Sequence, residues 1–156
     1  MTPPTHFSAQ EVDALARAHA DCEERGEFSD LMATLVEDPL YEFHPLGVQI
    51  KGAEAILRYY ERVRRDYNPQ VVSSALVDLI AGNSAAVLEY AIRLRIDQEI
   101  VDERLIAIMP VVGNLFGGER IYSSDRVLRR LLGEMLEEVK PIPPLADLTP
   151  GPARQV

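Results

Sequence analysis

The pattern of apolar and polar positions begins with an amphipathic helix. From Ser8 to about Arg25, inward-facing positions recur at steps of three or four residues, the period of an α-helix. Ser8 and Glu11 have the spacing of a capping box at its start, and Gly26 is a typical stop. The inward stripe consists of Val12, Leu15, His19 and Cys22.

Two more helices are predicted in the first half of the chain. One follows Gly26 directly and is expected to end near residues 37–39, because Pro39 disfavours helical backbone in the residue before it. The other covers about residues 53–66 and stops at Asn68-Pro69. Their apolar positions are Phe28, Leu31, Met32 and Leu35 in the first, and Ile56, Tyr60, Val63 and Tyr67 in the second.

The stretch 41–60, which leads into the third helix, contains the first candidate for chemistry. It predicts a short strand, a break at His44-Pro45, a turn at Gly47 and a second short strand before the helix that Gly52 opens. Proline fixes the backbone here, so a histidine at the end of a strand is held in a defined place. We therefore treat His44 as a candidate for a working side chain.

Strands dominate the second half. They are predicted over residues 70–80, 85–97, 99–112 and 115–122, followed by a helix over about 124–132. The second of these strands alternates cleanly, with an apolar face that includes Tyr90 and Ile92 and a polar face that includes Glu89 and Arg93. Gly117-Gly118 lies inside the last strand and indicates a bulge.

Helices followed by a long antiparallel meander and one more helix predict an α+β fold. We expect a cone-shaped α+β barrel, in which a strongly curved antiparallel sheet wraps around the N-terminal helices and encloses a pocket. Residues 1–133 are expected to form this single domain. The proline-rich residues 134–156 are expected to form a C-terminal tail, which either stays extended or lies over the domain or a partner.

Composition narrows the function classes. The chain has 156 residues, of which 47% are hydrophobic, enough for one substantial core. A formal net charge of −9 disfavours nucleic acid and membrane surfaces as partners. The lone Cys22 excludes an internal disulfide and suits a reducing cytoplasm, and no apolar run approaches the ~20 residues of a membrane span. The three histidines and one cysteine do not stand at ligand spacing, so we do not expect a metal site.

Three segments resemble the nuclear transport factor 2-like superfamily, in its SnoaL-like and ketosteroid isomerase-like branch. QEVDALARAH (10–19) is similar to the first helix of the ketosteroid isomerases. FHPLGVQIKGAEAILRYY (43–60) resembles a later segment of the same enzymes that carries their Asp-Pro pair, and GGERIYSSDRVLRRLLG (117–133) resembles the closing strand and helix of SnoaL-like proteins. The resemblance covers about residues 8–133 and implies the cone fold with a small-molecule pocket.

The resemblance also assigns candidate catalytic residues. The isomerases' catalytic base falls on His44, and the tyrosine that donates to the substrate oxygen falls on His19. Their second donor, a protonated aspartate, falls near residues 105–107, where Glu103 is the nearest acid. The isomerase set is not reproduced, which disfavours steroid isomerisation. An epoxide hydrolase pattern is likewise incomplete, because Ile121 stands where its second aspartate would be.

Residue chemistry supports these candidates and also offers a plainer alternative for each. His44 has the pKa range for proton transfer at neutral pH, or it is a histidine that only bonds the backbone at the rim. His19 lies on the inward stripe, so it needs either a protein partner or a ligand. Glu103 and Asp102 are strand neighbours that point to opposite faces, so one of them enters the cone.

Other residues are expected to shape the pocket and the outer surface. Substrate contacts, or simple core packing, are expected from Tyr60, Tyr90, Met32 and Phe116. The polar strand face with Glu89, Arg93 and Arg95 is expected to be a homodimer surface on the outside of the sheet, as the resemblance implies.

Two function hypotheses follow from the sequence. The first is a cofactor-independent isomerase, cyclase or dehydratase that applies acid–base chemistry to a hydrophobic, oxygenated small molecule, with His44, His19 and Glu103 as its catalytic residues. The second is a non-catalytic ligand-binding or dimeric assembly module of the same fold. An open cone that both histidines face favours the enzyme, whereas a cone filled by Tyr60 or Tyr90 favours the module.

Overall fold

A computed structural model describes residues 7–144 of the chain. The helices are α1 (Ala9–Arg25), α2 (Phe28–Ala33), α3 (Ala53–Arg62) and α4 (Asp125–Leu132), with the shorter turns η1 (Val63–Tyr67), η2 (Asn68–Gln70) and η3 (Gly133–Glu137). The strands are β1 (Leu35–His44), β2 (Val48–Lys51), β3 (Val71–Ala81), β4 (Ala85–Ile96), β5 (Glu99–Val112), β6 (Leu115–Ser123) and β7 (Lys140–Pro141).

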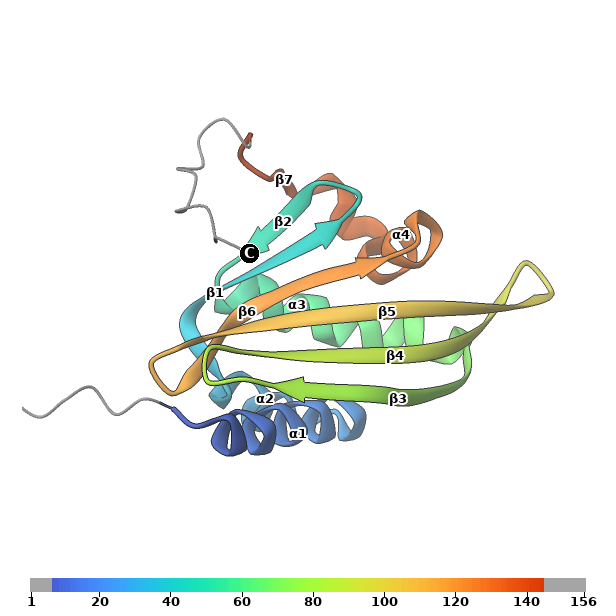
Figure 1. The fold of residues 1–156 in the computed structure, drawn as a ribbon. Helices are drawn as coiled ribbons and strands as arrows, with labels where there is room; N and C mark the ends of the chain where they lie inside the picture. The colour runs from blue at the N-terminus through green and yellow to red at the C-terminus, as the bar shows by residue number, and fades with distance from the viewer. Residues whose placement is uncertain (1–6, 145–156) are drawn as a thin grey trace, which may run out of the picture.

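The strands form one curved sheet in the order β3-β4-β5-β6-β1-β2-β7. All neighbouring strands are antiparallel except β1 and β6, which pair in parallel. Helices α1, α2 and α3 lie along one side of this sheet, and its other side is left uncovered by the described helices (Figure 1). The predicted α+β class, with a curved, antiparallel-dominated sheet around N-terminal helices, is confirmed. The sheet stays open, with β3 and β7 as its edges.

Helix α1 forms where the apolar stripe and the caps predict it. Ser8 and Glu11 make the full capping box, and Gly26 ends the helix in a left-handed conformation with φ of 70°. Val12, Ala16 and His19 are buried against the sheet, so His19 faces inward as expected.

The second helix is shorter than the sequence suggests. We expected it to continue to residues 37–39, but α2 ends at Ala33 and β1 begins at Leu35. The reason is long-range pairing, since Leu35 lies opposite Phe116 in β6. Pro39 is tolerated inside β1 because the pairing with β6 shifts register between Leu35 and Leu40, so that a backbone donor is not needed there.

The predicted glycine bulge brings two strands unusually close. Gly118 has φ of 135°, and a Cβ atom at this position would lie 1.9 Å from the carbonyl oxygen of Leu40. Only glycine allows β6 to approach β1 so closely in this conformation. The pairing of β6 with β5 shifts register by one residue across this region, between Ile108 and Val111. This shift confirms the bulge indicated by Gly117-Gly118, which sets which β6 side chains turn inward.

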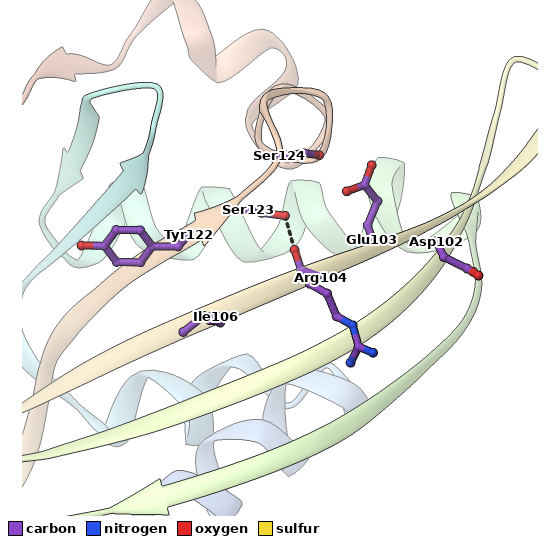
Figure 2. Close-up of a pocket in the computed structure, with 7 residues that line it drawn as sticks. All are labelled: Asp102, Glu103, Arg104, Ile106, Tyr122, Ser123 and Ser124. Atoms are coloured by element: carbon purple, nitrogen blue, oxygen red, sulfur yellow. Dashed lines mark hydrogen bonds between the residues drawn. The ribbon is translucent and has the colours of Figure 1, made fainter.

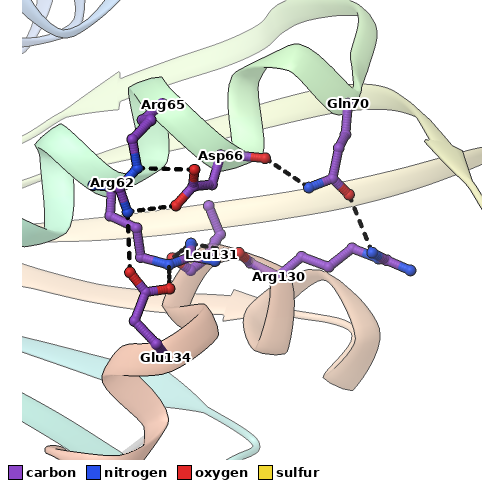
Figure 3. A network of polar contacts seen from close by, with 7 residues as sticks. All are labelled: Arg62, Arg65, Asp66, Gln70, Arg130, Leu131 and Glu134. Carbon is purple, nitrogen blue, oxygen red and sulfur yellow. Dashed lines mark hydrogen bonds and ion pairs between the residues drawn. The ribbon is translucent and has the colours of Figure 1, made fainter.

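A buried arginine ties α4 to α3 (Figure 3). The Nη1 atom of Arg62 donates to the carbonyl oxygens of Arg130 and Leu131 at 2.7 and 2.6 Å, and its Nε donates to Glu134 at 2.9 Å. These bonds satisfy carbonyls that the end of a helix leaves without partners. A Cβ atom at Gly133 would lie 1.7 Å from Arg62 Nη2, so a side chain there would displace the guanidinium from these bonds.

The chain beyond Gly133 starts out packed on the domain. Met135 is buried, and Lys140 and Pro141 extend the sheet as β7 beside β2. Among the two outcomes foreseen for the tail, residues 134–144 therefore lie over the domain. The remaining tail, residues 145–156 with Leu145, Leu148 and their prolines, lies outside the described residues. The domain boundary at residue 133 stays a prediction.

The uncovered sheet face combines apolar side chains with paired charges. Arg93 bonds Asp102 at 2.7 Å, and Arg104 lies 3.6 Å from Glu89 on the neighbouring strand. The polar face predicted for β4 is thus present and its charges are largely compensated. The large exposed apolar residues on the strands include Val72, Leu76, Val77, Ile80, Ile100, Ile106 and Tyr122.

Candidate functional site

Five polar side chains from five parts of the chain meet inside the cone. We call them the polar cluster; they are His19, Thr34, Tyr41, Tyr60 and Glu119, and all are buried. They come from α1, the end of α2, β1, α3 and β6, respectively. Buried polar groups are costly unless they bond one another, and every member of this cluster does.

The contacts converge on a single oxygen atom. Glu119 Oε1 lies 3.1 Å from His19 Nε2, 3.1 Å from Tyr41 Oη and 3.0 Å from Tyr60 Oη. These contacts all use Oε1, and Oε2 has no hydrogen bond to any described residue. One carboxylate oxygen is thus held by three side chains, and the other is held by none of the described residues.

Thr34 determines which nitrogen of His19 carries a proton. Its hydroxyl donates to the Leu31 carbonyl at 2.6 Å, so at 2.6 Å from His19 Nδ1 it can only accept. Nδ1 therefore carries a proton, which it donates to Thr34, and Nε2 faces Glu119 and Tyr60. A carboxylate at Glu119 accepts a hydrogen bond from Nε2 when that nitrogen is protonated as well. A histidine held in this way can exchange a proton with Glu119 through Nε2 alone.

The two tyrosines remain hydrogen-bond donors at any ordinary pH. Burial raises the pKa of both Tyr41 and Tyr60 well above the usual value, and the negative charge of Glu119 raises it further. Their hydroxyl oxygens lie 2.5 Å apart, so they act as one unit beside the carboxylate. The arrangement is a carboxyl group with a histidine and two phenols, which is suited to moving a proton and stabilising the charge left behind.

A second carboxyl group enters the cone from α1. Glu23 follows His19 by four residues, so the two side chains share a helix face. Burial raises the pKa of the Glu23 carboxyl to about 7, the charge of Glu119 adds to this effect, and His19 opposes it. The side chain is half-buried, so this acid is enclosed by protein but still reached by solvent.

The structure places His44 on the opposite face of the sheet from His19. Tyr41 and Phe43 are fully buried, so strand alternation turns His44 outward. Its ring stacks on Tyr122 with centroids 4.7 Å apart, and its Nε2 bonds Glu42 at 3.0 Å. The two histidines therefore do not face one cavity as a pair. The catalytic role expected for His44 stays a prediction.

Glu103 and Asp102 point to opposite faces of β5, as expected. Asp102 bonds Arg93 on the uncovered face. Glu103 has only 9% of its side chain exposed and forms an ion pair with Arg126 of α4. Glu103 is thus the acid that turns inward, but its partner is Arg126 and not a histidine, and its catalytic role is likewise untested.

The residues expected to line the pocket take different positions. Tyr60 belongs to the polar cluster, and Phe116 packs edge-on against His19 with ring centroids 6.2 Å apart. Tyr90 and Met32 are half-buried beside the core. Their expected contacts with a substrate remain predictions.

Sequence reasoning missed Glu119, the centre of the cluster. Counting by alternation from Phe116 puts residue 119 on the outer face, whereas counting back from the buried Ile121 puts it on the inner face. The glycine bulge between these residues changes the register, so the second count holds. The sequence did carry a signal for this. Gly117-Gly118 indicates a bulge, and Glu119 follows it two residues before the inward-facing Ile121. Tyr41 was recognisable as the inward position of β1, two residues before Phe43.

Two shallow hollows lie on the uncovered face and not at the polar cluster. The larger, about 540 Å³, lies between β5 and the end of β6 (Figure 2). The smaller, about 320 Å³, crosses β3, β4 and β5. The larger is lined by Asp102, Glu103, Arg104, Ile106, Tyr122, Ser123 and Ser124.

Within residues 7–144, no group of three or more histidine, cysteine, aspartate or glutamate side chains is placed to hold a metal ion. Over the same residues, no helix combines the length and the apolar character needed to cross a membrane.

Comparison with known proteins identifies the fold. No protein-family model matches the sequence, and no curated protein sequence matches it. A candidate ketosteroid isomerase from Kribbella flavida has a similar structure, with 18% identity and a TM-score of 0.60 over 94% of this chain and 93% of the other. An NTF2-like protein from Burkholderia xenovorans has 16% identity and a TM-score of 0.62, with coverage of 80% and 98%. A candidate polyketide cyclase from Xanthomonas campestris pv. campestris has 17% identity and a TM-score of 0.60, with coverage of 79% and 98%. This chain has the fold of the nuclear transport factor 2-like proteins.

Proposed function

We propose that the protein is a cofactor-independent acid–base enzyme of the SnoaL-like type, an isomerase, cyclase or dehydratase for a hydrophobic, oxygenated small molecule. The observation that supports this most directly is the convergence on Glu119. Three side chains hold Oε1, and Oε2 is left for a substrate proton. In this proposal Glu119 takes the place that the sequence suggested for His44.

The chemistry uses the cluster as a unit. Glu119 Oε2 accepts a proton from the carbon beside a substrate carbonyl, and the electron pair of that C–H bond moves to the carbonyl oxygen. Once Glu119 is neutral, it no longer holds the hydroxyl protons of Tyr41 and Tyr60, so either phenol can donate to the new oxyanion. Return of the proton to another atom of the substrate completes an isomerisation. His19 steadies the carboxyl group through Nε2.

The test is proton exchange in deuterated water, with 2-tetralone as a hydrophobic ketone probe and NMR detection of deuterium at its acidic carbon. Wild-type protein should accelerate the exchange. Glu119→Gln keeps the shape of the side chain and should lose roughly 10²–10⁴-fold of the rate, the usual contribution of a general acid or base. Glu24→Gln is the matched control, because Glu24 lies on the same helix as His19 but is exposed.

The same assay decides between the two candidate bases. His44→Ala should reduce exchange strongly if the sequence-based assignment holds. Full exchange activity in Glu119→Gln, or no exchange by the wild-type protein, would contradict the proposal for Glu119.

A non-catalytic binding or assembly module is the second candidate. Tyr60 is only 2% exposed and bonds within the cluster, so it fills part of the cone. Both hollows described above open on the uncovered face. In this case the wild-type protein binds small molecules or a second copy but does not accelerate exchange, and Glu119→Gln affects only stability.

A further inference from the structure

Strand β3 forms one edge of the sheet and is covered by little of the described structure. It pairs with β4 on one side, and its other side has no neighbouring strand among the described residues (Figure 1). Eight of its eleven residues are exposed, whereas two of the twelve residues of β4 are. Every second N–H and C=O group of an edge strand points away from its neighbour, so β3 presents a row of unpaired backbone donors and acceptors.

Exposed apolar side chains are concentrated on this strand. Of the eight large hydrophobic residues that are exposed in the described structure, four belong to β3. Two of these, Val72 and Val77, have no residue opposite them in β4, because the pairing of β3 with β4 shifts register at both places. They are 49% and 50% exposed, so their side chains are available to a further strand. The other two are Leu76 and Ile80.

The opposite edge of the sheet has the protection that β3 lacks. Strand β7 consists only of Lys140 and Pro141, and a short edge with a lysine and a proline discourages pairing with another chain. Strand β3 runs for eleven residues without proline, lysine or arginine, and its one charged residue is Asp78. A long apolar edge of this kind is a template for another strand.

A second copy of this chain suits the edge better than a free peptide does. The chain carries a formal net charge of −9, so two copies repel each other unless they meet where charge is sparse. Charged residues make up 26% of the chain but one residue in eleven of β3. The β3 strand of a second copy is also already ordered in its own sheet, whereas a free peptide loses conformational freedom when it binds.

The length of β3 matches what a stable interface needs. Antiparallel strands form about one backbone hydrogen bond per residue, so pairing along the whole strand supplies up to about 10 bonds. A typical protein interface contains about 10 direct hydrogen bonds. Since β7 is too short to act as a second template, this pairing closes at two copies instead of continuing into a fibre.

We propose that β3 pairs in antiparallel orientation with β3 of a second copy, so that the two sheets join edge to edge about a two-fold axis. Leu76 is the middle residue of the strand and lies near this axis, with Val77 beside it. The interface is separate from the uncovered face of the sheet. It goes beyond the proposed function and does not depend on it.

The experiment combines molar mass from sedimentation equilibrium with amide hydrogen exchange measured by NMR. Val77→Lys places two like charges near the axis and should halve the molar mass of the wild-type assembly. Val112→Lys is the matched control, because Val112 is 58% exposed but lies at the hairpin end of β5, and it should leave the mass unchanged. In the wild type, the outward amides of β3 should show protection at least about 10-fold greater than those of Asn83 and Ser84, in the exposed turn after β3.

A monomeric wild type would overturn the inference and leave this edge to an extended segment of another protein. No change of mass in Val77→Lys, or an equal loss in Val112→Lys, would also overturn it. If Val77→Lys does not fold, the wild-type exchange data decide, because outward β3 amides as unprotected as the turn reject the pairing. Ile106→Glu, on the uncovered face, should leave the β3 protection intact. Val77 lies outside the polar cluster, so Val77→Lys should keep the ketone exchange activity, and the two proposals fail separately.

Discussion

His19 Nε2 lies 3.1 Å from Glu119 Oε1, although 100 residues separate them in the chain. The contact joins the first helix to the last long strand, and both side chains are buried. Buried polar pairs of this kind contribute little net stability, because desolvation offsets their attraction. The pair therefore adds little to the net stability of the fold.

Thr34 should be essential for the orientation of this pair. Thr34→Val keeps the shape of the side chain but leaves the His19 Nδ1–H group without its acceptor. We expect the free energy of unfolding to fall by about 1–3 kcal/mol, the cost of a buried polar group without a partner. Chemical denaturation measures this change, and nitrogen NMR of the His19 ring should show loss of the single Nδ1–H tautomer.

Thr34→Ser is the matched control, because it retains the hydroxyl that bonds His19 and Leu31. It should keep the tautomer and most of the stability. If the valine variant keeps one tautomer and full stability, Thr34 does not hold the ring.

Gly118 should tolerate no side chain. Gly118→Ala places a Cβ atom 1.9 Å from the Leu40 carbonyl oxygen, so β1 and β6 must move apart. These strands carry Tyr41 and Glu119, and a loss above about 4 kcal/mol in unfolding free energy is expected for such a clash.

Gly113→Ala is the control: its φ of 67° is also positive, but nothing lies within 4 Å of the added carbon. It should cost only about 1–2 kcal/mol, the strain of a left-handed residue. Equal losses in thermal or chemical unfolding would show that space is not the cause.

Local patterns predicted the helices and most of the strands because each depends on neighbours in sequence. The stripe of α1, its capping box and the alternation of β4 are examples. The early end of α2 was not predictable in this way, since it depends on the pairing of Leu35 with Phe116, far along the chain. Tertiary contacts of this kind override the local preference of a segment for helix.

The candidate site was harder to predict than the fold, for one physical reason. Which face a strand residue takes depends on register, and a bulge changes register by one. His19 was found because a helix stripe has no such ambiguity. Glu119 was missed because the Gly117-Gly118 bulge precedes it, and His44 was assigned to the cone although Tyr41 and Phe43 already occupied the inward positions of its strand.

The uncovered sheet face should pair with a second copy of the chain. Ile106 is 38% exposed at its centre, and the nearby charges are compensated by the Arg93–Asp102 pair. Apolar residues among neutralised charges favour association. Ile106→Glu should therefore halve the molar mass measured by light scattering after gel filtration.

Val112→Glu is the control, because Val112 is equally apolar and more exposed but lies at the hairpin end of β5. A wild-type monomer, or a dimer that survives Ile106→Glu, would contradict this surface.

Glu23 should make the protein less stable as pH rises. Its pKa is raised from the ordinary 4.5 to about 7 in the folded chain, so the folded state binds the proton more strongly than the unfolded state. The contribution of Glu23 to the free energy of unfolding is therefore complete below about pH 4.5. It falls between about pH 4.5 and pH 7 and changes no further above that range. Glu23→Gln cannot ionise, so it should flatten this part of the curve and be more stable than wild type at pH 8. Denaturation curves at several pH values measure the slope, with Glu24→Gln as the exposed control; a wild-type slope in Glu23→Gln would mean that another group titrates.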